Sequence, residues 1–352
     1  MNRYWSKLVG GLDPYVPGEQ PQDQQYIKLN TNESPYPPAP GVEQVLKNFA
    51  IDRLRRYPDP QSSQLIAALA DYHGLKSQQV FVGNGSDEVL AHAFQAFFKK
   101  DEPILFPDIC YSFYPVYCAL YEIDFDRIAL DDSFRIDLAG YRRANGGIII
   151  PNPNAPTGIA LGLAELRELL ADNPEAVVII DEAYVDFGTD SASQLNAEFD
   201  NLLVVQTYSK SRNLAGLRLG YALGHEQLIE ALQRIKNSFN SYPVNSLTSA
   251  IGLASLADEA YFNECKQRVI ASRERLTRAL TGLGFEVFPS SANFVFVRHP
   301  TNAAESLYLG LKASGILVRY FKTPRIDNCL RITIGTEAEC DALIEALKKI
   351  LS

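Results

Sequence analysis

The sequence has no apolar run long enough to cross a membrane. Its longest uninterrupted apolar stretches, such as 147–151 and 176–180, are far shorter than the roughly 18 residues that a spanning helix needs. The first twenty residues contain Pro14, Pro17 and charged side chains but no continuous apolar segment, so they do not resemble a secretory signal. We therefore expect a cytoplasmic protein without a membrane partner.

Cysteine, histidine and excess positive charge are also scarce. The five cysteines form no Cys-x-x-Cys pair, and the four histidines are far apart in the chain. These spacings argue against a disulfide framework or a metal site and predict reduced thiols. The chain has 33 Lys and Arg residues against 42 Asp and Glu, a formal net charge of −9, whereas nucleic-acid binders concentrate positive charge. We expect neither a metal nor a nucleic-acid partner.

The remaining pattern predicts an α/β protein. With 352 residues, 46% of them hydrophobic, the chain can build one large domain and a smaller one. Residues 1–40 are rich in Pro, Gln and Asn and predict an extended amino-terminal arm. In residues 41–245, short β-branched runs alternate with amphipathic stretches, which predicts a sheet covered by helices on both faces. Residues 246–352 predict a smaller α+β domain.

Seven short apolar runs are the expected strands of the large domain. They are residues 80–82, 104–106, 124–130, 147–150, 177–180, 202–206 and 217–222. Helices are expected between them, among others over 86–98, 161–170 and 226–236.

A glycine-rich segment joins the first of these strands to a helix. Gly83 and Gly85 permit a tight turn, and the free amide groups at the start of the helix can receive a phosphate, aided by the helix dipole. The segment is not a dinucleotide fingerprint, because Glu88 stands where the third glycine would be, and it lacks the ending of a P-loop. Taken alone, it is explained more simply as a turn in which Ser86 caps a helix.

Two further strands end in residues that can carry chemistry. Asp181 follows an apolar strand, and ligands of open α/β sheets bind beyond the carboxyl ends of strands. A helix cap and a Mg²⁺ carboxylate are the alternatives for Asp181, and the missing P-loop weakens the second. Lys210 comes just after the next strand, where desolvation can remove its proton, as a Schiff-base lysine requires. Taken alone, an exposed surface lysine is the commoner outcome.

In chain order these elements resemble the fold type I enzymes that depend on pyridoxal 5′-phosphate, the aspartate aminotransferase superfamily. The resemblance covers nearly the whole chain and is strongest over Gly83–Glu88, Pro151–Gly158, Asp181–Tyr184 and Thr207–Arg218. It implies that Lys210 holds the cofactor covalently and acts as general acid and base. It also implies that Asp181 faces the ring nitrogen and that Tyr184 donates a hydrogen bond to the ring oxygen.

The same resemblance assigns the rest of the cofactor site. Five residues are expected around the phosphate: Gly85, Ser86, Asp87, Ser209 and Arg218. Tyr111 is expected to stack on the pyridine ring, with core packing as the alternative.

One position departs from the family pattern. Ala155 stands where the family usually has an asparagine that binds the ring oxygen, and Asn154 comes one residue earlier. We expect Asn154 to take over that hydrogen bond, and the alternative is that Tyr184 acts alone.

Within the superfamily, the sequence is similar to the histidinol-phosphate aminotransferases. The similar segments are Leu12–Tyr15, Leu29–Tyr36, Arg56–Gln61, Gly315–Arg319 and Cys329–Gly335. The similarity implies a homodimer with shared active sites, in which Tyr57 contacts the cofactor phosphate of the neighbouring subunit. It also implies four substrate-binding residues: Tyr15, Asn32, Arg319 and Arg331.

The expected reaction transfers an amino group between L-histidinol phosphate and 2-oxoglutarate, giving imidazole acetol phosphate and glutamate, as in histidine biosynthesis. Planar guanidinium groups can bind both the phosphate of one substrate and the carboxylates of the other. For Arg319, pairing with a surface carboxylate is the alternative. Two other activities stay open at this point: a lyase resembling threonine-phosphate decarboxylase, and an aromatic amino-acid aminotransferase.

Overall fold

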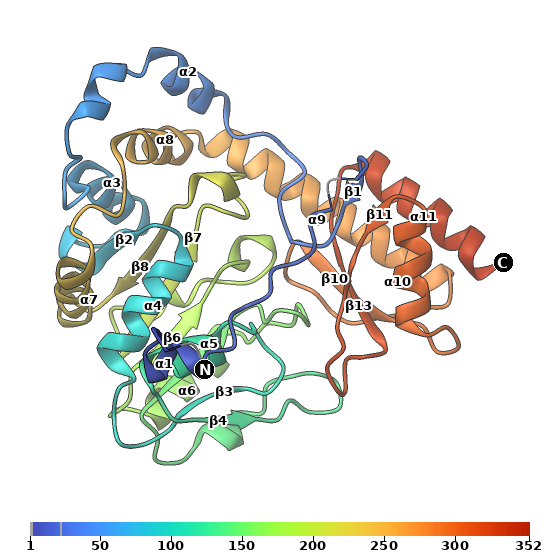
Figure 1. The fold of residues 1–352 in the computed structure, drawn as a ribbon, viewed down its shortest axis with the longest axis horizontal. Coiled ribbons are helices and arrows are strands. Elements are labelled where there is room, and N and C mark those ends of the chain that lie inside the picture. The colour runs from blue at the N-terminus through green and yellow to red at the C-terminus, as the bar shows by residue number, and fades with distance from the viewer. Residues whose placement is uncertain (1–2, 22) are drawn as a thin grey trace.

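The computed structural model describes residues 3–21 and 23–352, which fold around a large and a small sheet (Figure 1). The strands of the large sheet are β2 (Val80–Gly83), β3 (Ile104–Pro107), β4 (Phe125–Ile128), β5 (Gly147–Pro151), β6 (Val178–Asp181), β7 (Leu202–Thr207) and β8 (Gly220–Gly224). Their order is β2-β8-β7-β6-β5-β3-β4, and β8 alone is antiparallel to its neighbours. The predicted mostly parallel sheet of seven strands is confirmed.

Helices cover both faces of this sheet because its strands are apolar on both sides. Ile148 and Ile150 pack into one hydrophobic cluster and Ile149 into another, as the alternation of side chains along a strand requires. The first cluster includes residues of α3 (Ser63–His73), α6 (Leu163–Asp172) and α8 (Ser246–Ala257). The second includes residues of α4 (Ser86–Phe97), α5 (Tyr114–Tyr121) and α7 (Glu226–Phe239). The carboxyl ends of the parallel strands stay open to a ligand.

The smaller sheet is antiparallel and carries the carboxyl-terminal helices. Its order is β12 (Arg319–Tyr320), β13 (Cys329–Thr333), β10 (Phe294–Arg298) and β9 (Glu286–Val287). Its helices are α9 (Glu259–Gly282), α10 (Ala304–Ala313) and α11 (Glu337–Leu351). Figure 1 shows the long α9 running from α8 towards this sheet. The pairing of β12 with β13 places Arg319 opposite Arg331.

The amino-terminal arm is less extended than the sequence predicts. It begins with α1 (Lys7–Gly10), and its β1 (Ile27–Lys28) pairs in parallel with β11 (Ile316–Leu317). Leu29 is buried in the small-domain core, so this end of the arm is anchored there. The domain boundaries at residues 40 and 245 stay a prediction. The first helix after the second boundary, α8, packs against α3 and α2 (Pro40–Asn48).

One strand starts later than expected. A strand over 217–222 was predicted, but residues 215–217 form a 3₁₀ turn and Arg218 adopts a left-handed φ of 56°, so β8 begins at Gly220. The cysteines are free thiols, as predicted. Across residues 3–21 and 23–352, no helix combines the length and the apolar character that a membrane span requires.

Candidate active site

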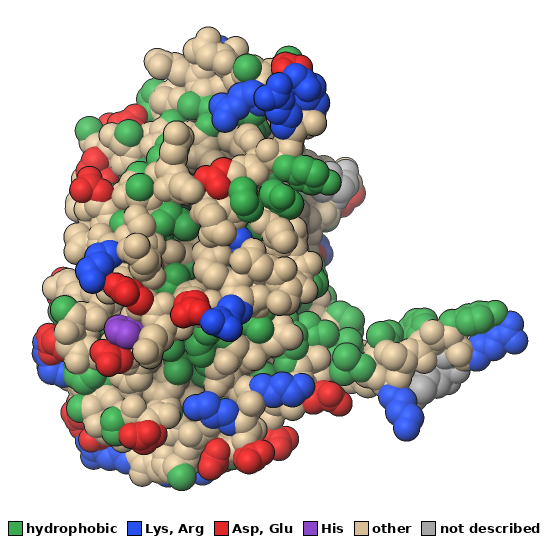
Figure 2. All heavy atoms as spheres, turned by 90° about the vertical axis from the view of Figure 1, so that its left-hand side faces the viewer, with side chains coloured by type: hydrophobic (Ala, Val, Ile, Leu, Met, Phe, Trp, Pro, Cys, Tyr) green, Lys and Arg blue, Asp and Glu red, His purple; other side chains and the backbone are tan. Residues whose placement is uncertain are grey.

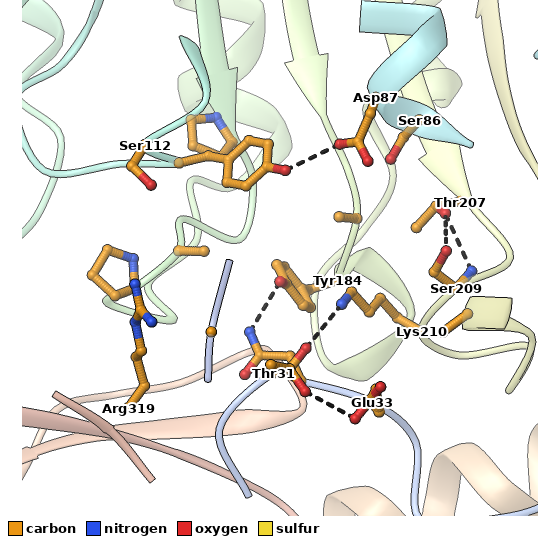
Figure 3. Close-up of a pocket in the computed structure, with 18 of the residues that line it drawn as sticks. Thr31, Glu33, Ser86, Asp87, Ser112, Tyr184, Thr207, Ser209, Lys210 and Arg319 are labelled. Atoms are coloured by element: carbon orange, nitrogen blue, oxygen red, sulfur yellow. Dashed lines mark hydrogen bonds between the residues drawn. The ribbon is translucent and has the colours of Figure 1, made fainter. Parts of the chain in front are cut away.

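A cavity of about 420 Å³ lies at the carboxyl ends of β5, β6 and β7 (Figure 3). Pro151, Asp181 and Thr207, the last residues of these three strands, are part of its wall. The loops after β3, β5, β6 and β7, the N-terminus of α4, the arm and the small domain supply the rest of the lining. A cavity at this edge of the sheet is where open α/β folds bind their ligands.

Asp181 reaches the cavity from the end of β6 with 5% of its surface exposed. The Tyr114 hydroxyl donates to its Oδ2 at 2.8 Å. Its Oδ1 is buried and has no hydrogen-bond partner in the described part of the chain. Burial raises the pKa of Asp181 from 3.8 to about 6, and the nearby Asp87 adds to the rise. The protonated ring nitrogen of a bound pyridoxal phosphate would give Oδ1 the hydrogen-bond partner that it lacks. Its positive charge would also stabilise the ionised form of the Asp181 carboxyl group.

Lys210 and Tyr184 meet inside the cavity (Figure 3). The Lys210 Nζ lies 3.4 Å from the Thr31 carbonyl oxygen and 5.6 Å from the centre of the Tyr184 ring. The Tyr184 ring packs edge-on against Phe294, with ring centroids 5.1 Å apart. Its hydroxyl accepts a hydrogen bond of 3.0 Å from Asn32 Nδ2. The amine and the hydroxyl predicted to act on the cofactor thus lie at one site.

Two glycines bring the N-terminus of α4 to the cavity wall. At Gly85, with a φ of +85°, a Cβ atom would lie 2.6 Å from Arg218 Nη2. At Gly220, a Cβ atom would lie 2.3 Å from the Ser86 backbone nitrogen. The absence of side chains at these positions therefore lets the helix amides, β8 and a guanidinium approach one another. Such a cradle binds an anion through the helix terminus and the positive charge.

The other predicted phosphate-binding residues lie at the same wall. The Arg218 Nη2 pairs with Asp87 Oδ2 at 2.9 Å, and Nη1 donates to Ser209 Oγ at 3.5 Å. The Ser209 Oγ also accepts from Thr207 Oγ1 at 3.0 Å. Residues far apart in the chain thus bring a guanidinium group and two hydroxyl groups to one wall of the cavity, and these are donors that a phosphate can use.

Aromatic rings form a further part of the wall. Tyr111 donates its hydroxyl to Asp87 Oδ1 at 3.0 Å and meets Tyr114 edge-on. Tyr15 of the arm lies over this group, with its ring centroid 4.9 Å from that of Phe113 and 6.2 Å from that of Tyr111. The two tyrosines predicted from the sequence therefore line the same cavity.

Arg319 and Arg331 project into the cavity from the small sheet. The Arg331 Nη2 donates to the Asn30 carbonyl oxygen at 2.9 Å, but its buried Nε has no partner in the described residues. Burial lowers the pKa of Arg331, and the charge of Arg319 lowers it further. Two guanidinium groups held side by side in this way attract an anionic ligand.

Three predicted residues do not line this cavity: Gly85, Asn154 and Tyr57. The Asn154 Nδ2 donates to the Ile109 carbonyl oxygen at 2.9 Å and to Thr157 Oγ1 at 3.1 Å, so its amide is used inside the loop. Ala155 lines the cavity instead, and the expected replacement by Asn154 finds no support in this geometry. Tyr57 is 82% exposed and stacks on Tyr242, with ring centroids 4.7 Å apart.

The structure adds residues that the sequence analysis did not single out. They are Thr31, Glu33, Cys110, Ser112, Tyr114, Thr207 and Phe321. Tyr114 lies in a stretch crowded with aromatic residues, which by itself predicts core packing. Its role appears once Asp181 is found beside it in the fold.

Comparisons with known proteins agree with this geometry. The family model for class I and II aminotransferases matches residues 24–347. Histidinol-phosphate aminotransferase 1 of Bordetella parapertussis is 57% identical, and the match covers 100% of each chain. The chain belongs to the histidinol-phosphate aminotransferases of this family. A second such enzyme, from Hydrogenovibrio crunogenus, is 56% identical over 100% of this chain and 99% of the relative.

A solved member of the histidinol-phosphate aminotransferases has the same fold. The crystal structure of histidinol-phosphate aminotransferase from Sinorhizobium meliloti in complex with pyridoxal-5′-phosphate is 25% identical and has a TM-score of 0.89. The match covers 99% of this chain and 98% of that one. The prediction of a pyridoxal-phosphate-dependent aminotransferase of fold type I is confirmed. The lyase and the aromatic aminotransferase are not favoured.

Proposed function

We propose that this aminotransferase transfers the amino group between L-histidinol phosphate and 2-oxoglutarate, giving imidazole acetol phosphate and glutamate, in histidine biosynthesis. The observation that carries the proposal is the arginine pair. Arg319 and Arg331 lie opposite each other on β12 and β13 and line the cavity that holds Lys210. One substrate ends in a phosphate and the other in carboxylates, and guanidinium groups bind both.

The residues of the large domain fit pyridoxal 5′-phosphate. When bound, the cofactor supplies an electron sink for the substrate carbon that loses its proton. Asp181, whose Oδ1 has no partner in the described residues, would keep the proton on the ring nitrogen of the cofactor. Ser86, Ser209 and Arg218 bind the phosphate at the N-terminus of α4.

Lys210 moves the proton of the reaction. Its Nζ lies inside the cavity, near the Thr31 carbonyl oxygen and above the Tyr184 ring. With the cofactor and a substrate bound, the Lys210 amine would accept the proton from the substrate carbon and later return one. Tyr111 would stack on the cofactor ring, and Tyr15, which lies beside it in the cavity wall, would contact the substrate.

The working unit is a cytoplasmic homodimer with shared sites. Tyr57 and Tyr242 form an exposed aromatic stack, which in a monomer would leave apolar area in water. The amino-terminal segment projects from the body of the molecule (Figure 2), and Trp5 and Val9 on it are 56% and 44% exposed. A second copy that covers these surfaces would bring its Tyr57 to the phosphate end of the cavity.

The experiment that tests the reaction is a half-reaction screen. Cofactor-loaded protein is mixed with one amino donor at a time, without an acceptor, and the visible absorbance of the bound cofactor is followed. Histidinol phosphate and glutamate are expected to remove the absorbance, and Lys210→Ala is expected to remove the response. Faster loss with an aromatic amino acid, or release of CO₂ from threonine phosphate, would contradict the proposed substrate.

A further inference from the structure

One of the two expected hydrogen-bond donors to the cofactor ring oxygen is missing from the cavity wall. Ala155 lines the wall and has no polar side chain, and Asn154 uses its amide inside the loop. Tyr184 is the remaining expected donor. The direction of its single hydroxyl proton therefore decides whether the ring oxygen receives a hydrogen bond from it.

The neighbour of the Tyr184 hydroxyl is Asn32, which is fixed at four atoms. Its Nδ2 donates to the Tyr184 hydroxyl at 3.0 Å. Its backbone N–H donates to Thr333 Oγ1 at 3.0 Å, and its Oδ1 accepts from the same Oγ1 at 3.0 Å. Its carbonyl oxygen accepts from Asn293 Nδ2 at 3.1 Å. Asn32 is 1% exposed and adopts a left-handed φ of 56°, which these bonds hold in place.

The Thr333 hydroxyl determines which end of the Asn32 amide faces Tyr184. Because the hydroxyl proton of Thr333 goes to Oδ1, the NH₂ end of the amide points to the Tyr184 oxygen. Tyr184 then acts as acceptor towards Asn32 and keeps its own proton for the cavity. If the amide turned over, Oδ1 would attract that proton and Tyr184 would point away from the cofactor.

We propose that Thr333 is a positioning residue, which orients the Asn32 amide so that Tyr184 donates to the ring oxygen of the cofactor. This inference rests on the proposed function. Thr333 is 2% exposed and does not line the cavity, so it acts through Asn32. It ends β13 two residues after Arg331, and side chains two apart on a strand share a face. One face of β13 thus serves both the substrate anion and the cofactor ring.

The test is a pH titration of the visible band of the cofactor-loaded protein. A donor to the ring oxygen stabilises its negative charge and so lowers the pKa of the linkage between Lys210 and the cofactor. Thr333→Val, which keeps the shape and removes the hydroxyl, is expected to raise that pKa by about 0.5 to 1 pH unit, the shift that one lost hydrogen bond gives. Thr333→Ser keeps the hydroxyl and is expected to titrate like the wild type.

Two reference variants separate this inference from the proposed function. Tyr184→Phe removes the donor itself and is expected to raise the pKa at least as much as Thr333→Val. Asn32→Leu removes the amide without changing Thr333. If Thr333→Val does not fold, a raised pKa in Asn32→Leu supports the relay, by which we mean the hydrogen bonds from Thr333 through Asn32 to Tyr184.

Three outcomes would overturn the relay. The first is a folded Thr333→Val protein with the wild-type pKa of the visible band, while Tyr184→Phe has a raised pKa. The second is a Thr333→Ser protein whose pKa rises as far as that of Thr333→Val. The third is an Asn32→Leu protein whose pKa equals that of the wild type. A visible band that persists unchanged in Lys210→Ala would instead overturn the proposed function.

Discussion

Arg331 is the residue whose surroundings describe the substrate most directly. Arg331 lies opposite Arg319 in the small sheet, and its buried Nε has no partner in the described part of the chain. Burying a cation in this way is costly unless an anion completes the site. The two arginines therefore destabilise the ligand-free protein, and binding of an anionic group offsets this cost.

Replacing Arg331 by lysine is expected to weaken both substrates. Lysine keeps the charge but loses the planar pair of donors, which corresponds to roughly 1.5–3 kcal/mol, or about a tenfold to 150-fold rise in KM. Steady-state kinetics with histidinol phosphate and with 2-oxoglutarate measure the effect. Arg298→Lys is the control, because Arg298 is paired with Glu286 and does not line the cavity. An unchanged KM for either substrate in Arg331→Lys would refute the shared role.

Asp181 predicts a pH dependence of the cofactor-free protein. Its pKa is raised from 3.8 to about 6 by burial, so between these values the folded protein binds more protons than the unfolded chain. This contribution therefore lowers stability as pH rises from about 4 to 6, by on the order of 3 kcal/mol if the whole shift is realised. Asp181→Asn is expected to remove that part of the decrease.

Urea unfolding of both cofactor-free proteins at pH 4, 5, 6 and 7 measures the difference. Glu182, whose pKa burial raises to about 7, is present in both proteins, so its contribution cancels in the comparison. Parallel pH profiles for the two proteins would show that Asp181 does not titrate in this range.

At the scale of the elements, the start of α4 is a turn that tolerates glycine alone. Gly85→Ala would place a methyl group 2.6 Å from Arg218 Nη2 at a φ of +85°. With a ψ of 161°, this backbone lies in a region that is essentially confined to glycine and costs another residue about 1–3 kcal/mol. We expect affinity for pyridoxal phosphate to fall at least about tenfold, because the cradle opens. Titration of cofactor-free protein measures this, and Gly282→Ala, with no atom within 4 Å of its added Cβ, is the control.

Strong local patterns made much of the large sheet predictable. The runs Ile104–Phe106 and Gly147–Ile150 each lie within one residue of the observed strand, because buried parallel strands are continuously apolar. The strand predicted at 217 failed because Arg218 needs a left-handed backbone to meet the α4 cradle. That requirement comes from tertiary contacts, and the local sequence does not reveal it.

In the candidate site too, the residues in local motifs were predictable and the contacts that depend on the tertiary fold were not. Lys210, Asp181 and the phosphate residues follow strands in recognisable motifs, and the fold brings them together. The relay from Thr333 through Asn32 joins residues 301 positions apart, which no local pattern reveals. The orientation of Asn154 was equally hidden, because it depends on the Ile109 carbonyl oxygen of another loop.

At the scale of the whole molecule, Tyr57 predicts that active sites are shared between subunits. It is 82% exposed and absent from the cavity lining of its own chain. Lys210→Ala chains and Tyr57→Phe chains are each expected to have low activity alone. Mixing them through reversible denaturation is expected to restore activity, because every mixed dimer contains one native site. Activity of the mixture equal to the mean of the two parents would show that Tyr57 serves its own chain or none.

The central claim, that the cavity moves an amino group between two anionic substrates, is tested most directly by following the nitrogen. Histidinol phosphate labelled with ¹⁵N is incubated with 2-oxoglutarate and the cofactor-loaded protein, and the products are analysed by mass spectrometry. The label is expected in glutamate, in an amount equal to the imidazole acetol phosphate formed, and in neither product with Lys210→Ala. Label released as ammonia, or unlabelled glutamate beside consumed histidinol phosphate, would contradict the account.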